Sequence, residues 1–250
     1  GRYDTTKSFS SSGSWEYFNL ATVPISALGL ATAIFDGRYV YFLQVYNNGY
    51  IANVVRYDTQ LTFTNPAAWS NFNLITSLAS DLKGFWSAVF DGRYIYLIPY
   101  DNTGRLAAVR YDTQSSFTSP SSWTTYITGI VSLSGLFDGR YVYLIGPQSL
   151  SRYDTTASFS SATSWENVLY SSVLSSSVSG MSYASFDGRY IYVAAQNGID
   201  GIIRFDTSQT LNSTSSYSYL ASNSFPSFSL PAFAAVVFDG RYTYFIPSQT

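Results

Sequence analysis

Residues 85–98 read Phe-Trp-Ser-Ala-Val-Phe-Asp-Gly-Arg-Tyr-Ile-Tyr-Leu-Ile, a sequence typical of two β-strands joined by a tight turn. A short apolar segment, 85–90, is followed by Asp91-Gly92 and then by an aromatic and β-branched segment, 94–98. Asp-Gly between two such segments is the strongest short-range signal for a β-hairpin, because the type I′ turn needs positive φ. We therefore expect an antiparallel hairpin here, turning on Asp91-Gly92.

The motif at this turn, Phe-Asp-Gly-Arg-Tyr, occurs five times along the chain. Its copies begin at Phe35, Phe90, Phe137, Phe186 and Phe238. A second motif, Arg-Tyr/Phe-Asp-Thr, begins at Arg2, Arg56, Arg110, Arg152 and Arg204. Eleven residues after the aspartate of each second motif stands an aromatic residue: Trp15, Trp69, Trp123, Trp165 and Tyr217. A repeat of roughly 40 to 55 residues is typical of solenoids and propellers.

One repeat, residues 85–128, shows what each unit contains. After the hairpin, 101–104 predicts a second turn, 106–111 a third strand and 123–127 a fourth strand. Four short antiparallel strands, repeated, form a blade of a β-propeller. Strands that are apolar on both faces fit this fold, because each blade packs between two others.

The two ends of the chain carry complementary parts of a repeat. Residues 2–20 supply third and fourth strands, and residues 233–246 supply first and second strands. We therefore predict an all-β, five-bladed propeller over 1–250 as a single domain, closed by a blade that both termini share. The predicted blade units are 21–74, 75–128, 129–170, 171–220, and 221–250 with 1–20. The alternative is part of a six- or seven-bladed ring.

The repeat resembles the kelch repeat, in which a hydrophobic-Asp-Gly-basic turn and a Tyr-containing strand precede a Tyr-Asp corner and a tryptophan. The kelch diglycine is missing. The corresponding positions are Leu43-Gln44, Ile98-Pro99, Ile145-Gly146, Ala194-Ala195 and Ile246-Pro247. The resemblance implies propeller architecture. Five internally similar blades are also similar in architecture to tachylectin-type lectins, which bind sugars.

The composition excludes several classes of function. The chain has no Cys and no His, so disulfides, Cys/His metal sites and His-based acid–base catalysis are excluded. The net charge of −2 gives no footprint for nucleic acid, and no apolar run is long enough for membrane insertion. We predict no cofactor and no metal. A surface rich in Ser, Thr, Asn and Gln, with two Lys, favours an extracellular or cell-surface location.

Nearly all charged residues belong to the two motifs, which favours a structural role for them. Each aspartate stands where it can cap backbone N–H groups of a turn, and each arginine can form a fork to such a carboxylate. The residues assigned this role are Asp36, Arg38, Asp91, Arg93, Asp138, Arg140, Asp187, Arg189, Asp239, Arg241, Arg56, Asp58, Arg110 and Asp112. Alternatively, each Arg/Asp pair is one of five identical ligand sites.

Outside the repeat positions, three carboxylates remain: Asp81, Asp101 and Asp200. A glycosidase needs carboxylates that converge on one pocket, and these three lie in different predicted loops. We therefore predict no catalytic residues and no enzyme activity, with a glycan-active enzyme as an alternative. Asn212-Ser213-Thr214 is a possible glycosylation sequon.

The loops at one end of the ring vary, whereas the Asp-Gly turns and Asp-Thr corners at the other end are uniform. Binding residues concentrate on variable loops held by a rigid scaffold. The predicted ligand-binding residues are Tyr46, Asn48, Tyr50, Asp81, Lys83, Trp86, Asp101 and Asn102; the alternative is that these are ordinary solvated turns. Aromatic rings beside amides and carboxylates suit neutral sugars. We expect a recognition module for carbohydrate or a protein surface, or alternatively a structural subunit of a surface layer or fibre that binds copies of itself.

Overall fold

The hairpin of residues 85–98 opens a four-stranded antiparallel sheet. The computed structural model describes residues 1–23, 29–46, 50–100, 105–176, 178–197, 200–224 and 232–248. The sheet consists of β7 (Phe85–Phe90), β8 (Tyr94–Pro99), β9 (Ala107–Asp112) and β10 (Trp123–Ile127). Neighbours along the chain pair in the order β7-β8-β9-β10, which confirms the four strands predicted for this repeat.

Three further sheets repeat this order, and all four are called blades 1 to 4 along the chain. Blade 1 contains β3 (Leu30–Phe35), β4 (Tyr39–Tyr46), β5 (Tyr50–Asp58) and β6 (Trp69–Asn73). Blade 2 is the β7–β10 sheet. Blade 3 contains β11 (Ser134–Phe137), β12 (Tyr141–Ile145), β13 (Ser149–Asp154) and β14 (Trp165–Leu169). Blade 4 contains β15 (Met181–Phe186), β16 (Tyr190–Ala195), β17 (Ile202–Asp206) and β18 (Tyr217–Leu220).

Short helical turns complete the connections. Two single-turn α-helices, α1 (Leu74–Ser77) and α2 (Tyr170–Val173), follow the fourth strands of blades 1 and 3. Short 3-10 turns occupy Ser12–Ser14, Leu20–Thr22, Pro66–Ala68, Pro120–Ser122, Ala162–Ser164 and Thr214–Ser216. Five of the six lead directly into a repeated aromatic residue, whose ring closes the corner. In blade 2, the Trp123 indole N–H donates to the carbonyl of Phe117 at 3.0 Å. In blade 4, the Tyr217 hydroxyl donates instead, to the carbonyl of Leu211 at 2.7 Å.

The hairpin turn differs from the prediction by one residue. Asp91 N–H donates to the Tyr94 carbonyl at 3.1 Å, so the central residues are Gly92 and Arg93 rather than Asp91 and Gly92. Gly92 has φ of +101°, as the sequence required of this glycine. The predicted hairpin with positive φ at Gly92 is therefore confirmed, and its turn lies one residue further along the chain than the Asp-Gly signal indicates. The reason is that Asp91 precedes the two central residues of the turn, and its carboxylate accepts the backbone N–H groups of Arg93 and Tyr94.

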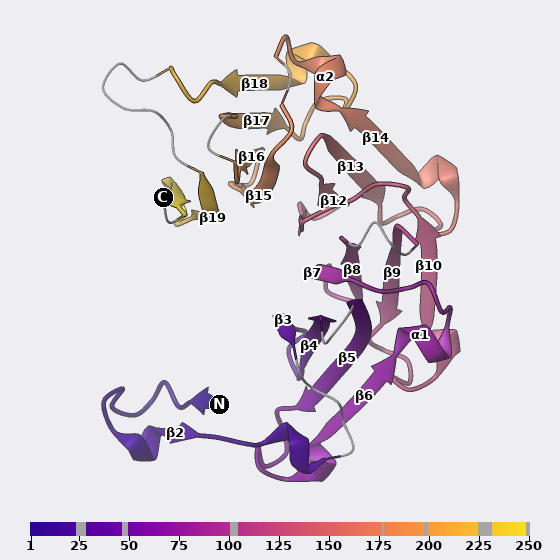
Figure 1. Cartoon of the computed structure of the whole chain (residues 1–250), viewed down its shortest axis with the longest axis vertical. Coiled ribbons are helices and arrows are strands. Elements are labelled where there is room, and N and C mark those ends of the chain that lie inside the picture. Colours follow the sequence, from indigo (N-terminus) through magenta and orange to yellow (C-terminus); the bar gives the residue numbers. More distant parts are fainter. Residues whose placement is uncertain are drawn as a thin grey trace.

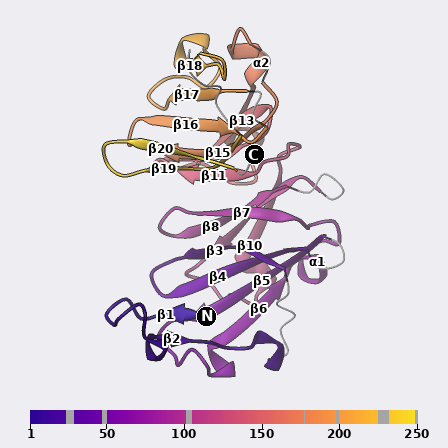
Figure 2. The same cartoon turned by 60° about the vertical axis from the view of Figure 1, so that its left-hand side comes forward.

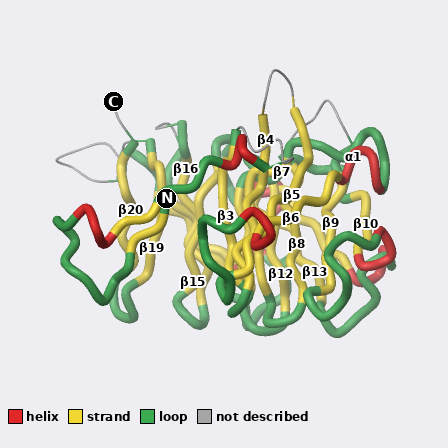
Figure 3. The backbone as a smooth tube through the Cα atoms, turned by 90° about the horizontal axis from the view of Figure 1, so that it is seen from below, coloured by secondary structure: helices red, strands yellow, loops and turns green. Residues whose placement is uncertain are grey.

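The blades stand side by side around an open ring (Figure 1). Their first strands lie innermost, in the order β3, β7, β11, β15 and β19 (Phe233–Phe238). The turned view shows the sheets stacked along this array (Figure 2), and the strands run between two rims of loops (Figure 3). The core lies between the blades: Tyr41 and Leu43 of blade 1 share one cluster with Leu97 and Tyr111 of blade 2. Blades therefore bury both of their faces, as the apolar strands predict.

The two ends of the chain form half-blades. The N-terminal half-blade is β1 (Arg2–Tyr3) paired with β2 (Trp15–Glu16), and the C-terminal half-blade is β19 paired with β20 (Thr243–Pro247). They are separate two-stranded sheets on either side of the opening in Figure 1, with no strand pairing between β1 and β20. The shared closing blade that the sequence predicts is thus not formed here. Each half-blade packs on a different neighbour instead, blade 1 for β1–β2 and blade 4 for β19–β20.

Candidate functional site

Each hairpin turn is held by its own aspartate. In blade 2, Asp91 Oδ1 accepts from the N–H groups of Arg93 at 2.8 Å and Tyr94 at 2.6 Å. Its Oδ2 accepts from the hydroxyl of Tyr96 at 2.6 Å. Burial and the adjacent carboxylate raise the pKa of Tyr96, so the hydroxyl remains a donor. The same three bonds recur at Asp36, Asp138, Asp187 and Asp239.

In each of the four complete blades, the arginine of the hairpin turn reaches the aspartate of the second motif of the same blade. Arg93 Nη2 lies 2.8 Å from Asp112 Oδ2, and this bond lowers the pKa of the Asp112 carboxyl. The equivalent pairs are Arg38–Asp58, Arg140–Asp154 and Arg189–Asp206. The Thr113 hydroxyl donates to the Arg93 carbonyl at 2.6 Å, so turn and corner are tied together at one end of the blade.

In blades 1 and 2, the arginine of the second motif links neighbouring blades. The Arg110 guanidinium lies 4.3 Å from the ring centre of Tyr94 in its own blade and 4.8 Å from that of Phe159 in blade 3. Arg56 stands likewise over Tyr39 and over Phe117 of blade 2. A guanidinium over an aromatic face is an attractive cation–π contact. The repeated charges in the complete blades are therefore held in turn, corner and blade–blade contacts.

The opposite end of the ring carries the predicted variable loops. There the Arg105 N–H donates to the Asp81 carbonyl at 2.7 Å, and its side chain pairs with Asp81 Oδ2 at 3.0 Å. The Tyr100 N–H donates to the Gly84 carbonyl at 2.9 Å. These bonds place the loop before β7 beside the connection between β8 and β9. These two variable connections therefore lie side by side.

Trp86 stands out among the predicted site residues. Its side chain is 44% exposed, and its ring centre lies 5.2 Å from that of Tyr100 at an angle of 44°. It occupies a β-bulge in β7, between paired residues Phe85 and Ser87. The same bulge recurs in β3, β15 and β19, where the bulged residues are Ala31, Ser182 and Ala234. The scaffold requires only a small residue there, so the large exposed indole of blade 2 needs another explanation.

The other predicted site residues are placed as follows. Lys83 is half-buried in the loop between Asp81 and β7. Tyr46 ends β4 and Tyr50 begins β5, and the two are paired in register. Asn48, Asp101 and Asn102 lie outside the described residues. Asp81 and Lys83 thus lie in the loop before β7, and Trp86 lies near the start of that strand.

Two residues that sequence reasoning missed, Tyr100 and Arg105, join this group. Both flank the predicted turn 101–104, so the signal that points to them is their position at the ends of a variable connection. A cavity of about 340 Å³ lies at the corresponding loops of blade 3 and is lined by Ile130, Val131, Pro147, Gln148, Ser149 and Leu169.

The carboxylates outside the repeat do not converge within the described residues. Asp81 is paired with Arg105, and Asp200 is buried in blade 4. Asp200 Oδ2 accepts from the Ser179 and Gly180 N–H groups at 3.0 and 3.1 Å, and from the Asn197 amide at 2.8 Å. It therefore ties the β16–β17 loop to the segment before β15. No group of three or more potential metal ligands occurs in the part of the chain that the structure describes.

Two surface features concern the chain as a whole. Asn212 of the sequon is exposed in the corner between β17 and β18. None of the helices among the described residues has the length and hydrophobicity to cross a membrane.

Comparisons with known proteins show the fold. No family model and no curated protein matches the sequence. Among solved structures, the chain is similar to the Neurospora crassa Pan2 WD40 domain, with TM-score 0.52 and 10% identity over 87% of this chain and 58% of that one. It is also similar to a chain of the nidogen/laminin complex, with TM-score 0.53 and 11% identity over 86% of this chain and 71% of that one. A third similar chain is that of Kuenenia stuttgartiensis hydrazine synthase, with TM-score 0.54 and 13% identity over 91% of this chain and 58% of that one. The chain thus spans less than two thirds of the Pan2 and hydrazine synthase chains. At these identities the likeness concerns architecture alone, and the chain has the fold of a β-propeller.

Proposed function

We propose that this protein is a non-enzymatic recognition module that binds its ligand at the end of the ring that carries the variable loops, here called the variable end. Trp86 is the central contact. The observation that supports this is the exposed indole at a bulge where other blades carry Ala or Ser. Bulges re-aim side chains and are frequent next to functional sites. The repeated charges of the complete blades are engaged in the scaffold, so the unique residues at this end are the better candidates.

The ligand class that these groups suit best is carbohydrate. Trp86 and Tyr100 offer aromatic faces, and the Asp81–Arg105 pair offers both acceptors and donors. A few oriented polar groups beside aromatic surface is the usual composition of a small-molecule site. Neutral sugars combine apolar C–H faces with hydroxyl groups and match this pairing. Tachylectin-type lectins, which the five repeats resemble in architecture only, bind sugars as well; a protein surface is the alternative ligand.

A glycan array with two matched variants tests this function. Trp86→Ala removes the indole, and the fold accepts alanine there because Ala31 and Ala234 occupy the same bulge in other strands. The control is Phe35→Ala, since Phe35 is 53% exposed at the opposite end of β3. We expect saturable glycan binding that Trp86→Ala weakens about tenfold or more and Phe35→Ala leaves unchanged. Binding that survives Trp86→Ala, or no glycan binding at all, contradicts the proposal.

A second function, assembly into a surface layer or fibre, is favoured by a different observation. The half-blades expose large apolar side chains, among them Tyr242 at 53%, Tyr244 at 46% and Ile246 at 43%. Contiguous exposed apolar surface marks an interaction site. We propose that the 250 residues form one domain with five blades, the fifth being complete when a β19–β20 half-blade meets a β1–β2 half-blade. An extracellular or cell-surface location fits both functions.

A further inference from the structure

The N-terminal half-blade is docked on blade 1 in the way that complete blades dock on one another. Arg2 Nη1 donates to the Tyr57 hydroxyl at 2.8 Å, as Arg110 Nη1 donates to the Tyr153 hydroxyl at 3.3 Å. The Arg2 guanidinium also lies 4.9 Å from the ring centre of Phe63. This distance matches the 4.8 Å of the equivalent contact between blades 2 and 3. The half-blade is therefore a correctly placed part of a fifth blade.

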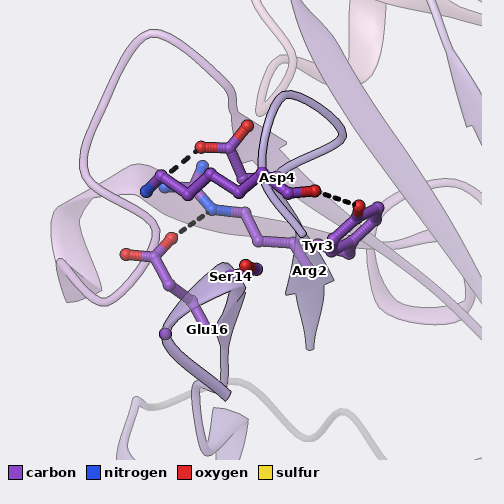
Figure 4. Close-up of a pocket in the computed structure, with 7 residues that line it drawn as sticks. Arg2, Tyr3, Asp4, Ser14 and Glu16 are labelled. Carbon is purple, nitrogen blue, oxygen red and sulfur yellow. Dashed lines mark hydrogen bonds and ion pairs between the residues drawn. The ribbon is translucent and has the colours of Figure 1, made fainter. Parts of the chain in front are cut away.

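In the complete blades, the first hairpin places a tyrosine and an arginine against the second motif, and no described residue of this chain takes those places at the N-terminal half-blade. In blade 2, the Arg110 guanidinium lies over the Tyr94 ring, and Asp112 forms an ion pair with Arg93. At the corresponding Arg2 and Asp4, no such partner is found among the described residues, and Lys7 lies 3.3 Å from Asp4 instead. A cavity of about 390 Å³ opens here, lined by Arg2, Asp4, Lys7 and Glu16 among others (Figure 4). This cavity is called the socket.

The C-terminal half-blade carries the matching groups in an exposed position. The Arg241 guanidinium lies 4.8 Å from the ring centre of Tyr242, the same arrangement as Arg93 on Tyr94. Tyr244 keeps its hydrogen bond to Asp239 at 2.7 Å but is 46% exposed, whereas its equivalent Tyr96 is 1% exposed. The Gly-Arg-Tyr turn of β19–β20 is therefore formed but uncovered.

The register of the missing contact follows from the complete blades. In blade 2, Tyr94 faces Asp112, Ile95 faces Tyr111 and Tyr96 faces Arg110, and blades 1, 3 and 4 repeat this register. The same register sets Tyr242 opposite Asp4, Thr243 opposite Tyr3 and Tyr244 opposite Arg2. Arg241 then meets Asp4, where it takes the place that Lys7 has in this structure and that Arg93 has beside Asp112 in blade 2.

We propose that the β19–β20 half-blade of one copy of this chain completes the β1–β2 half-blade of a second copy, with Arg241 and Tyr242 entering the socket. Within one chain the half-blades stand apart across the opening, each held by regular contacts to its own neighbour (Figure 1). Joining them in one chain requires the two half-blades to move together across this opening. A second copy offers a partner while each half-blade keeps the contacts to its own neighbouring blade. The inference rests on the assembly function proposed above and names its interface.

Charge exchange between copies tests the interface. Asp4→Arg places arginine against Arg241, and Arg241→Asp places aspartate against Asp4, so each variant alone is self-repelling at the socket. In a mixture, the arginine that Asp4→Arg introduces meets the aspartate that Arg241→Asp introduces, and the unaltered Asp4 and Arg241 also meet. Both ion pairs therefore form only where a copy of one variant contacts a copy of the other. Light scattering after size-exclusion chromatography, over a range of concentrations, measures association of the 250-residue chain. Circular dichroism checks folding, which both exposed positions should tolerate.

We expect the unaltered chain to associate, each single variant to do so about tenfold or more weakly, and the mixture to recover association. A matched control, Arg189→Asp, alters the equivalent pair inside blade 4 and should leave association unchanged. If the chain associates equally well with and without the charge-reversal variants, the proposed interface is wrong, but the assembly function is not contradicted. A chain that is monomeric in every sample overturns both. A double variant, Tyr3→Cys with Thr243→Cys, tests joining within one chain. If it forms a disulfide inside a monomer, the half-blades join within one chain and the inference is overturned.

Discussion

Replacing Asp91 with alanine tests the role of the repeated aspartate in holding each blade. The carboxylate accepts two backbone N–H groups and the hydroxyl of Tyr96. Tyr96 is 1% exposed, so its hydroxyl would be left without a partner or water, which costs about 1–3 kcal/mol. The two N–H groups lie in a surface turn, can return to water, and together add about 1 kcal/mol.

The chain itself offers a matched control at Asp239. This aspartate makes the same three bonds, at 2.7 Å each, but its tyrosine, Tyr244, is 46% exposed. Water can replace the lost acceptor there. Asp91→Ala should therefore lower the free energy of unfolding by about 3 kcal/mol, and Asp239→Ala by about 1 kcal/mol or less. For a chain of this size these losses correspond to falls in Tm of about 6–12 °C and about 2–4 °C.

Urea denaturation and thermal melting at concentrations where the chain is monomeric measure both values. A double-mutant cycle with Tyr96→Phe isolates the hydroxyl–carboxylate bond, for which we expect a coupling of about 1–2 kcal/mol. Equal losses at Asp91 and Asp239 would refute the reasoning, because burial of the tyrosine would then have no effect. A loss below about 1 kcal/mol at Asp91 would show that the aspartate does not hold the blade.

Two further predictions concern the hairpin turn and acid stability. In Gly92→Ala the added methyl group meets no atom within 4 Å, but φ of +101° is strained for alanine. We therefore expect urea denaturation to show a free energy of unfolding lower by about 1–3 kcal/mol, and an unchanged value would contradict this. Arg140 and Arg189 lower the pKa of Asp154 and Asp206 to about 2, below the ordinary 3.8. Because the folded-state pKa is depressed, the stabilisation is complete above about pH 4 and is lost as pH falls through about 2. Unfolding followed from pH 5 to pH 2 should show this loss, and the double variant Asp154→Asn, Asp206→Asn should show less of it; an unchanged profile would contradict the assignment.

Local sequence was sufficient to predict the blade. The Asp-Gly-Arg-Tyr hairpin, the Arg-Tyr-Asp-Thr strand and the following tryptophan act within one repeat, so their strands could be placed from residues 85–128 alone. The turn was misplaced by one residue because propensity identifies an Asp-Gly turn but not which N–H groups the carboxylate accepts. The short helices α1 and α2, at four residues each, are too brief to give a periodic pattern.

The candidate site was predictable only in part. The variable end followed from the direction of the chain through each blade, and Trp86 from its place beside a variable loop. That Trp86 occupies a recurrent bulge, and that it packs on Tyr100, depends on strand register and on contact between segments, which no local pattern contains. Arg105 likewise joins the group because the β8–β9 connection folds back onto Asp81.

The sequence by itself determined that this protein is built from repeated four-stranded blades, because every blade is specified by bonds between residues of one repeat. The tertiary structure decided how those blades are joined. Docking between blades includes cation–π contacts between different repeats, such as Arg2 on Phe63, which no single repeat contains. The motifs are identical whether the array closes into a ring or leaves two half-blades apart, and this is why the opening could not be read from the repeats.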